Sequence, residues 1–486
     1  MNFRARIAAA TRVLLGAKAR YEGAFPSRNR TTVPAALTYP RVDSTAMVRA
    51  ELQRKSRYFE RNNGFYNRAV DLFEQYVVGQ GLHLFPATAN EPWNQRALAY
   101  WEAWQPFADI ASRQHWTTLQ GLIARAWFVD GEVFLLKTYG STGNPRVQLI
   151  EAHRCKTPAG VDTAGTMVHD GVEVDENGRP VAYWFETDDW KSASLAPRTS
   201  SQRVDADSVV HVFEPSRPGQ LRGLPFCYPV LNVLHDLDDL ETFEMLAAKA
   251  NASTTTIVKT AAGEVSDEDL ARGTVTASDD TERTAYYRDV FGGTERVLKH
   301  GDDAQQFAGE RPSERTAAYW DYLLNKFCVG VGIPRELILP TSMQGTSQRA
   351  MLDVAAAWFR VRCGVLADHC GRIYEHVISY GIERDGQLRG APGDWRAFDF
   401  VPPKGPDVDV GRNTDAAIKE FKAGMTTLQE LYGQKGQQWR RAITQRATEA
   451  AFVEEAARAA GVEPARVLML DPNEIASNNA NQGSQP

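Results

Sequence analysis

Two groups of residues in this sequence could bind a metal ion. The first is an acidic cluster made of Asp236, Asp238, Asp239 and Glu241. Carboxylate oxygens are the ligands that Mg²⁺ prefers, so the cluster could serve a metal-dependent nuclease. Acidic side chains on the solvent-exposed face of a helix are far more common, because charged groups are rarely buried. The cluster therefore leaves a nuclease and a plain surface helix both open.

The second group contains Cys363, His369, Cys370 and His376. Cysteine and histidine are the usual zinc ligands, and a structural zinc site brings four of them together. On a helix that turns about 100° per residue, however, the cysteines and the histidines lie on two separate faces. The chain also lacks a C-x-x-C pair. We therefore expect neither a metal ion nor another cofactor.

The familiar catalytic motifs are missing from the sequence. There is no G-x-x-x-x-G-K-[ST] phosphate loop, and Gly79-Gln80-Gly81 lacks the third glycine of the dinucleotide fingerprint. There is no G-x-S-x-G elbow, and His115, His211 and His235 have no obvious partners. We expect a protein without enzymatic activity, and a metal-dependent DNA-processing enzyme that uses the acidic cluster is the alternative.

The composition is that of an ordinary globular protein. Hydrophobic residues make up 43% and charged residues 24% of the 486 positions, enough for about three domains. The five cysteines are scattered, which fits a reducing compartment better than a disulfide framework. No apolar run reaches the ~18 residues that span a bilayer, and basic residues interrupt the N-terminal segment. We expect a soluble intracellular protein that does not contact membranes.

The net charge of −6 conceals an uneven distribution. Residues 1–60 contain 12 basic and 4 acidic residues, a net charge of +8, so the remainder carries −14. A basic arm on an acidic body suggests that the arm contacts something anionic. The simpler interpretation is a solvated terminus that is partly disordered.

The stretch from Ser313 to Tyr380 predicts two helices joined by a polar loop. In the first helix, apolar residues recur at helical spacing up to Val331, and Gly332-Ile333-Pro334 ends it, because proline cannot continue the hydrogen-bond ladder. The loop from Pro340 to Gln348 carries no formal charge. The second helix runs from about Arg349 to Tyr380, and loops anchored between such elements often carry function.

Other segments have clear helix or strand patterns. Apolar periodicity, turn pairs such as Asn177-Gly178 and glycine breaks define them. The predicted helices are Met47–Val78 with a break at Arg61–Gly64, Pro92–Trp104, Trp116–Phe128, Pro225–Ala250 and a last helical part from Asp415 to about Ala460. The predicted strands are Val133–Leu136 with Val147–Ile150, Gly171–Val174 with Val181–Phe185, Ser208–Phe213, and a small hairpin of Glu295–Leu298 with Ala304–Phe307.

Several short runs of residues are each weak evidence for a family, but together their number and order are informative. They are Arg61-Asn62-Asn63, Ala69-Val70, Val77-Val78-Gly79-Gln80-Gly81-Leu82, Leu119-Gln120, Asp130-Gly131-Glu132-Val133-Phe134, Gly178-Arg179-Pro180-Val181-Ala182-Tyr183, His211-Val212-Phe213, Arg217-Pro218-Gly219-Gln220-Leu221-Arg222-Gly223-Leu224-Pro225 and Ser347-Gln348-Arg349-Ala350. Over roughly residues 45–440 the chain resembles the lambda-type portal proteins of tailed bacteriophages. The match is less faithful after the long helix, where Asp409-Val410-Gly411-Arg412 departs from the family pattern.

The resemblance implies an α+β portal fold with a mixed α/β wing, a helical stem, a small α/β clip, a long tunnel helix and a C-terminal helical crown. It divides the chain into a basic, weakly ordered arm (1–45), the wing (46–235), the stem and clip (236–330), the tunnel loop and long helix (331–390), the crown (391–470) and a disordered tail (471–486). These boundaries are expectations that follow from the family and from the order of elements.

The resemblance also implies a function and its partners. The family forms a ring, usually of about twelve subunits, at one capsid vertex, and double-stranded DNA passes through its channel during packaging and ejection. The expected partners are the terminase large subunit, the major capsid or scaffold protein and a head-tail adaptor, in the virion and, during assembly, in the host cytoplasm. A separate adaptor protein is a third interpretation, which the length of the chain disfavours.

The resemblance to this family also implies roles for individual residues. The tunnel loop that faces DNA would contain Ser342, Gln344, Thr346, Ser347, Gln348 and Arg349, and the clip would contain Arg296, Lys299 and His300. A loop with no charge before Arg349 suits DNA that must slide, because each Lys or Arg contact to a phosphate adds salt-dependent affinity. The alternative is that the loop is only a solvent-exposed connector.

Overall fold

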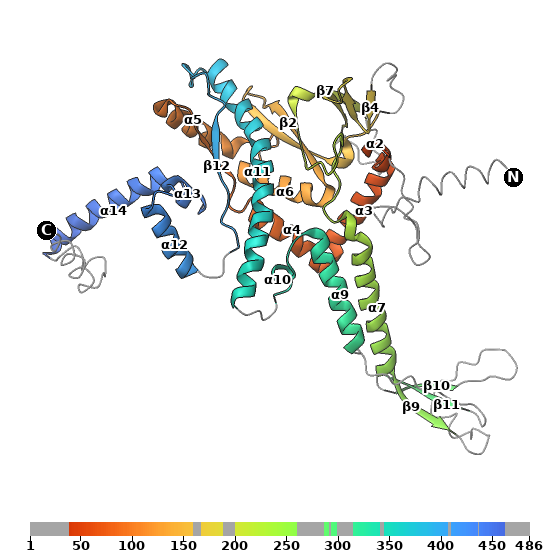
Figure 1. The fold of residues 1–486 in the computed structure, drawn as a ribbon. Helices are drawn as coiled ribbons and strands as arrows, with labels where there is room; N and C mark the ends of the chain where they lie inside the picture. The colour runs from red at the N-terminus through yellow and green to blue at the C-terminus, as the bar shows by residue number, and fades with distance from the viewer. Residues whose placement is uncertain are drawn as a thin grey trace, which may run out of the picture.

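A long helix, α11 (Gly345–Glu383), runs through the middle of the molecule, and most other elements pack around it (Figure 1). The computed structural model describes residues 38–158, 167–187, 200–259, 286–290, 293–298, 314–340, 345–406, 410–435 and 437–461. The fold mixes helices with four small sheets. Among the helices in these ranges, none is long and apolar enough to cross a bilayer.

The predicted helix at Met47–Val78 and its break are confirmed. The chain forms α3 (Ala46–Asn62) and α4 (Gly64–Val77), separated at Asn63. Asn63 has an extended backbone, and its side-chain oxygen accepts a hydrogen bond from the Tyr66 amide at 3.0 Å, which caps α4. A short helix, α2 (Pro40–Asp43), precedes them, and the rest of the predicted basic arm lies outside the described residues.

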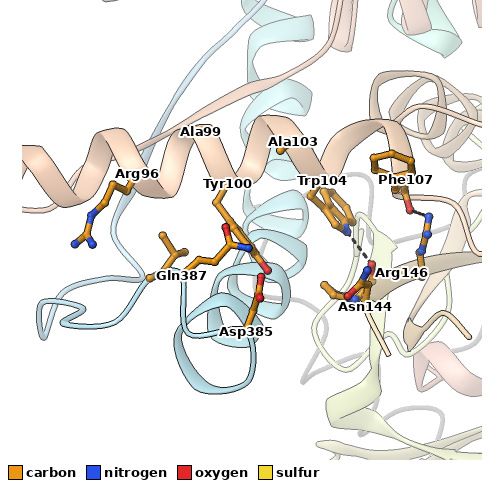
Figure 2. A pocket seen from close by; sticks show the side chains of 12 residues that line it. Arg96, Ala99, Tyr100, Ala103, Trp104, Phe107, Asn144, Arg146, Asp385 and Gln387 are labelled. Atoms are coloured by element: carbon orange, nitrogen blue, oxygen red, sulfur yellow. Dashed lines mark hydrogen bonds between the residues drawn. The ribbon is translucent and has the colours of Figure 1, made fainter. Parts of the chain in front are cut away.

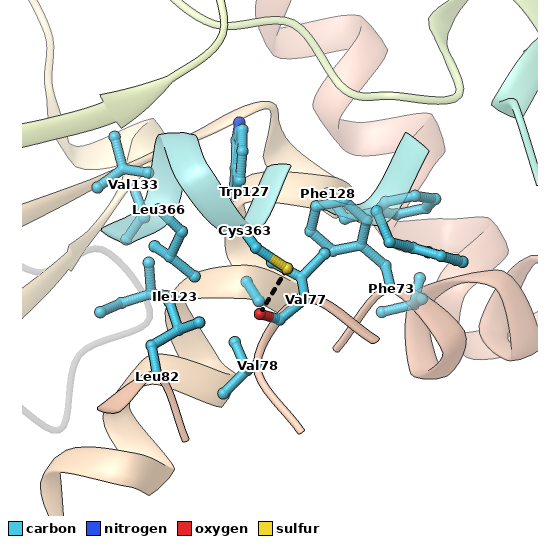
Figure 3. Close-up of a cluster of buried hydrophobic side chains, with 14 of the residues drawn as sticks. Phe73, Val77, Val78, Leu82, Ile123, Trp127, Phe128, Val133, Cys363 and Leu366 are labelled. Carbon is cyan, nitrogen blue, oxygen red and sulfur yellow. Dashed lines mark hydrogen bonds between the residues drawn. The ribbon is translucent and has the colours of Figure 1, made fainter. Parts of the chain in front are cut away.

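The two tryptophan-rich helices are also confirmed, as α5 (Glu91–Trp104) and α6 (Trp116–Asp130). Four tryptophans are fully buried, namely Trp93, Trp101, Trp116 and Trp127. Figure 3 shows where α4, α6 and α11 meet, with Phe73, Trp127 and Leu366 in one apolar cluster. Truncating a buried Phe or Trp to alanine typically costs about 3–5 kcal/mol, so each aromatic residue of this cluster contributes substantially to stability.

The first predicted hairpin is confirmed and forms the centre of a sheet. Its strands are β2 (Glu132–Tyr139) and β3 (Pro145–Glu151), and β8 (Val209–Phe213) pairs with the other edge of β2. All three strands are antiparallel to their neighbours. α6 contacts β2, and α11 contacts β8, so the sheet rests on the helical core.

The second predicted hairpin is confirmed inside a four-stranded antiparallel sheet. Gly178, in the turn, has φ = +79°, a conformation that glycine adopts without strain. The strands, in sheet order, are β4 (Met167–His169), β5 (Val172–Val174), β6 (Pro180–Glu186) and β7 (Ser201–Asp205). Their inner face forms a second, smaller core with β2 and β8 around Phe134 and Phe185.

Two antiparallel helices extend side by side away from this body (Figure 1). They are α7 (Leu231–Ser253) and α9 (Glu314–Val331), as their apolar patterns predicted. A short 3₁₀ turn (Tyr228–Val230) precedes α7, so the helix begins later than the predicted Pro225. Pro229 lies within this turn, and proline cannot donate the backbone hydrogen bond that a helix continuing from Pro225 would need.

A small sheet at the far end of this pair differs from the prediction. Its strands are β9 (Thr254–Lys259), β10 (Tyr286–Val290) and β11 (Gly293–Leu298), in the order β10-β11-β9. The predicted hairpin of Glu295–Leu298 with residues 304–307 is wrong, because β10 and β9 occupy both edges of β11. Residues 304–307 lie outside the described residues.

The segment after α9 follows the predicted order with shifted boundaries. Gly332 has φ = +83° at the end of α9, and a short helix, α10 (Arg335–Ile338), follows Pro334. α11 begins at Gly345, four residues before the predicted Arg349, and ends at Glu383. Serine and threonine are favoured at helix N-termini, so the polar run can start the helix.

The C-terminal part is divided more finely than predicted. Three helices, α12 (Val410–Lys422), α13 (Leu428–Gly433) and α14 (Trp439–Ala460), replace one helical part. Gly424 at φ = +72° and a capping box at Thr427 separate the first two. A strand, β12 (Phe398–Val401), pairs with β1 (His83–Pro86) and ties this part to the N-terminal half. The predicted tail lies outside the described residues.

Candidate functional site

The predicted DNA-facing residues lie around the start of α11. Thr346, Ser347, Gln348 and Arg349 belong to the first turns of this helix, whereas Ser342 and Gln344 lie outside the described residues. Gln348 is half-buried and Arg349 is exposed. The structure therefore brings four of the six residues together on one helical segment.

Described residues before and after this segment are packed in the core. Before it, Ile338 of α10 is buried, and its neighbours Leu337 and Leu339 pack against the main core. After it, Ala355 and Phe359 of α11 are buried in the same core. The described residues on either side of residues 341–344, in α10 and in the middle of α11, therefore belong to the main core.

The predicted clip residues are only partly described. Arg296 lies on β11, opposite Tyr287 of β10 and Ile257 of β9. Lys299 and His300 follow the end of this strand and lie outside the described residues.

The acidic cluster does not converge on one point. Asp238 accepts a hydrogen bond from Asn63 at 2.7 Å, Glu241 accepts one from the Trp320 indole at 2.8 Å, and Asp239 lies 3.3 Å from His235. These carboxylates point to different sides of α7 and already have partners. Across the ranges that the structure describes, no three His, Cys, Asp or Glu side chains gather in a way that could hold a metal ion.

The cysteines and histidines of α11 take part in packing. Burial raises the pKa of Cys363 and of Cys370 to about 12, so both thiols stay protonated at neutral pH. Cys363 donates a hydrogen bond to the Val77 carbonyl at 3.4 Å (Figure 3). The His376 ring lies against Tyr139, and burial lowers the pKa of His369 to about 4.

Sequence reasoning missed a buried ionic cluster around Glu132, the first residue of β2. Glu132 is fully buried, and Arg222 approaches it with Nε at 3.0 Å and Nη2 at 2.6 Å. Arg49 of α3 donates at 3.3 Å, and Nε2 of His211 on β8 lies at 2.9 Å. The Gly223 amide donates at 2.7 Å. The Glu132 carboxylate on β2 thus connects α3, β8 and the loop before α7.

The charges in this cluster balance one another. Burial alone would raise the pKa of Glu132, but Arg222 and His211 outweigh it and hold that pKa well below its usual range. Burial lowers the pKa of His211 below its ordinary value despite the neighbouring carboxylate. His211 is therefore neutral at neutral pH, with the proton on Nε2, which donates to Glu132.

The backbone at the end of α6 also lies in close contact with the backbone of the loop before α7. A Cβ atom on Gly131 would lie 2.0 Å from the Leu224 carbonyl carbon, and one on Gly223 would lie 2.1 Å from the Gly131 carbonyl oxygen. Gly131 also has φ = +84°, at the end of α6. The runs Asp130–Phe134 and Arg217–Pro225, which carried part of the resemblance, are therefore in contact, and their role is to join elements.

A groove of about 630 Å³ lies between α5, the β2–β3 turn and residues 385–388 (Figure 2). Tyr100 and Asp385 face each other there, and burial together with this carboxylate raises the pKa of Tyr100. The groove lies beyond the C-terminal end of α11, about 57 Å along the helix from Gly345. It is therefore separate from the predicted DNA-facing segment.

Comparison with known proteins gives a consistent answer. The family model for the phage portal protein of the lambda family matches residues 33–362. The chain is 25% identical over 400 residues to the probable portal protein of Halomonas phage phiHAP-1, covering 78% of this chain and 74% of that protein. It is 20% identical over 454 residues to portal protein B of Escherichia phage lambda, covering 83% of each chain.

Solved structures have more distant similarity. A chain from the neck of a native gene transfer agent particle, computed with C12 symmetry, aligns with a TM-score of 0.47 at 13% identity, covering 79% of this chain and 91% of that one. A chain from the virion of that particle aligns with a TM-score of 0.45, also at 13% identity, covering 79% of this chain and 94% of that one. Since the family model spans more than half of the sequence, this chain belongs to the lambda family of phage portal proteins.

Proposed function

We propose that copies of this chain form a closed ring, of about twelve subunits, at one vertex of a phage capsid, and that double-stranded DNA passes through its centre during packaging and ejection. The observation that carries the proposal is the family match, which spans α3 to the first half of α11 without interruption. That range includes the body, the projecting helix pair and the segment before α11.

The elements suggest a division of labour within the ring. In this proposal the body around β2 and α6 is the wing, α7 and α9 are the stem, and β9–β11 form the clip. The segment from Pro340 to Arg349 is the tunnel loop, and α12–α14 form the crown. The projection of α7 and α9 from the body, with a small sheet at their end, supports the stem and clip assignments (Figure 1).

The charge pattern supports the role of the tunnel loop. Residues 340–348 carry no formal charge, so they offer DNA only hydroxyls, amides and backbone groups. Each lysine or arginine that neutralises a phosphate releases counterions and adds affinity, which would slow a sliding duplex. A neutral loop makes weak contacts that exchange as DNA moves.

Two lysines in the loop test this assignment. Gln344→Lys/Thr346→Lys should impair DNA packaging in an assembled capsid system while leaving ring assembly unchanged. Thr142→Lys/Asn177→Lys, on two exposed β-turns, adds the same charge elsewhere and should package like the unmodified protein. Normal packaging by the loop variant would remove the channel-loop assignment.

The docking partners follow from the same proposal. The ring would bind the terminase large subunit and a head-tail adaptor, and the major capsid or scaffold protein would surround it, in the host cytoplasm during assembly and later in the virion. The basic segment 1–60 would contact DNA, scaffold or capsid inside the shell. Deletion of residues 1–40 should reduce incorporation into procapsids or packaging, and full activity without them would contradict this role.

A further inference from the structure

The groove between α5, the β2–β3 turn and residues 385–388 has an apolar floor. Ala99 and Ala103 of α5 are exposed, and because their side chains are single methyl groups, they leave room above the helix. Leu388 lines the opposite wall, and Phe107, just beyond α5, is 58% exposed. An apolar hollow of about 630 Å³ can hold a short stretch of peptide with its side chains.

Both ends of this groove carry a cation. Figure 2 shows Arg96 at one end and Arg146 at the other, with Tyr100 and Asp385 between them. The Arg146 guanidinium lies 5.7 Å from the centre of the Phe107 ring, so the two cations are separated by roughly the 18 Å that the chain rises from residue 96 to residue 107. Two guanidinium groups against one carboxylate, which already faces the Tyr100 hydroxyl, favour an occupant with negative charge.

A segment of this chain beyond the described residues has the complementary composition. Its sequence is Leu470-Asp471-Pro472-Asn473-Glu474-Ile475, which places two carboxylates between two apolar side chains and contains no basic residue. Proline restricts its own φ and disfavours helical backbone for the residue before it, so this sequence favours an extended segment. Six extended residues span about 20 Å, which is close to the length of the groove.

The C-terminal part of the described chain begins beside the groove. Arg441, in the first turn of α14, lies 3.6 Å from Glu102 of α5, and a pocket that Arg441 lines shares its alanine floor with the groove. From there α14 extends about 30 Å to Gly461. Residues 470–475 follow Gly461 by nine to fourteen positions, and an extended chain covers about 3.3 Å per residue. The segment can therefore return about 30–46 Å, enough to reach α5 of the same copy.

We propose that the groove beside α5 binds residues 470–475 of the same copy, with the arginines at its two ends facing the carboxylates of Asp471 and Glu474. The apolar side chains of the segment would lie on the alanine floor. Because the segment is tethered to α14, its effective concentration at the groove is of millimolar order, so a modest contact is enough. This contact does not depend on ring formation, and it would fix the start of the predicted tail against the body.

Photocross-linking in the full-length protein identifies the occupant directly. p-Benzoylphenylalanine in place of Gln387 or, separately, of Asn144 puts a reactive group on the wall of the groove. Trypsin cleaves after Arg466, and residues 467–486 contain no further lysine or arginine, so they form one peptide that mass spectrometry can recognise. We expect this peptide to be cross-linked to the groove in molecules that keep the mass of one chain on a denaturing gel.

Charge neutralisation tests the recognition. Asp471→Asn/Glu474→Gln and, separately, Arg96→Gln should each reduce the yield of this cross-link about fivefold or more, because opposite charges would no longer face each other. Ser477→Ala, in the same tail, and Arg179→Gln, on the exposed β5–β6 turn, are the matched controls and should leave the yield unchanged.

Filling the groove tests the site itself. Ala103→Trp should abolish the cross-link, whereas Ala447→Trp, at an exposed position of α14, should not. The proposal is overturned if the tail peptide is captured from neither Gln387 nor Asn144, or if a probe at Glu176, on the distant β5–β6 turn, captures it equally well. Capture of another segment, or of a second copy in a band of twice the mass, would also overturn it. None of these results bears on whether the protein forms a ring, so the proposed function is tested separately.

Discussion

At the scale of single residues, Glu132 is a fully buried carboxylate with several charged and polar partners. Two guanidinium groups, an imidazole and a backbone amide converge on one buried carboxylate. Removing one partner from such a set leaves an uncompensated buried charge, which costs more than the ion pair itself contributes. Substitutions in this cluster therefore test how much the loop before α7 contributes to the stability of the body.

Arg222→Met should lower the free energy of unfolding by about 3–5 kcal/mol, because Glu132 would lose its main counter-charge and the Ala152 and Cys155 carbonyls would lose a donor. Chemical denaturation of the variant and the unmodified protein measures the difference. Arg179→Met, on an exposed turn, is the control and should change stability by less than about 0.5 kcal/mol. An equal, small effect of both substitutions would show that the cluster is not stabilising.

The same cluster predicts acid sensitivity. Burial depresses the pKa of His211 from its ordinary 6.5, so the unfolded chain binds this proton first, and stability should fall as the pH drops below about 6.5. The depressed pKa of Glu132 acts in the same direction below its ordinary 4.5. His211→Gln should make the loss of thermal stability between about pH 7 and pH 5 shallower, since the amide does not titrate.

A matched substitution makes the pH experiment specific. His169→Gln, in β4 and outside the cluster, should leave the pH slope of the unmodified protein in place. A His211→Gln variant with an unchanged slope would show that another group causes the acid sensitivity.

The sequence predicted little of this chemistry. His211 had no visible partner there, because Glu132 lies 79 positions away and only folding brings them together. The runs containing Arg222 and Glu132 were recognised, but their spacing does not show that they meet. The cysteines and histidines of α11, by contrast, could be assigned to two separate faces from helical geometry alone, whereas the acidic cluster of α7 was left open by the sequence.

At the scale of elements, close backbone contact holds the end of α6 against the loop before α7. Gly223→Ala should lower the free energy of unfolding by about 2 kcal/mol or more, because its Cβ would lie 2.1 Å from a backbone oxygen that cannot move aside easily. Thermal or chemical denaturation measures the effect. Gly393→Ala has no atom within 4 Å of the new Cβ and should be nearly neutral. Similar stabilities for the two variants would contradict the described packing.

Elements with strong periodicity were predictable. α4, α5, α6 and α9 follow their apolar spacing, and the Asn177-Gly178 turn identified the β5–β6 hairpin. The errors occurred where the partner is distant in sequence. β11 pairs with β9, some 40 residues earlier, and no local pattern specifies that parallel pairing. The start of α11 depends on polar residues with weak preferences, so its boundary shifted.

At the scale of the whole molecule, a single copy of the chain exposes side chains on its projecting helices. α7 and α9 project from the body, and their exposed tyrosines, valine and charges have no covering element in the described chain. The structure of one copy leaves these side chains exposed. The predicted division into wing, stem, clip and crown stays a prediction, as do the individual loop contacts with DNA.

The most direct test of the ring is the mass and shape of the purified particle. Mass photometry combined with negative-stain electron microscopy should show rings with a central hole and a mass near about twelve times that of one chain. Monomers or dimers, both alone and after expression with capsid and scaffold proteins, would contradict the account.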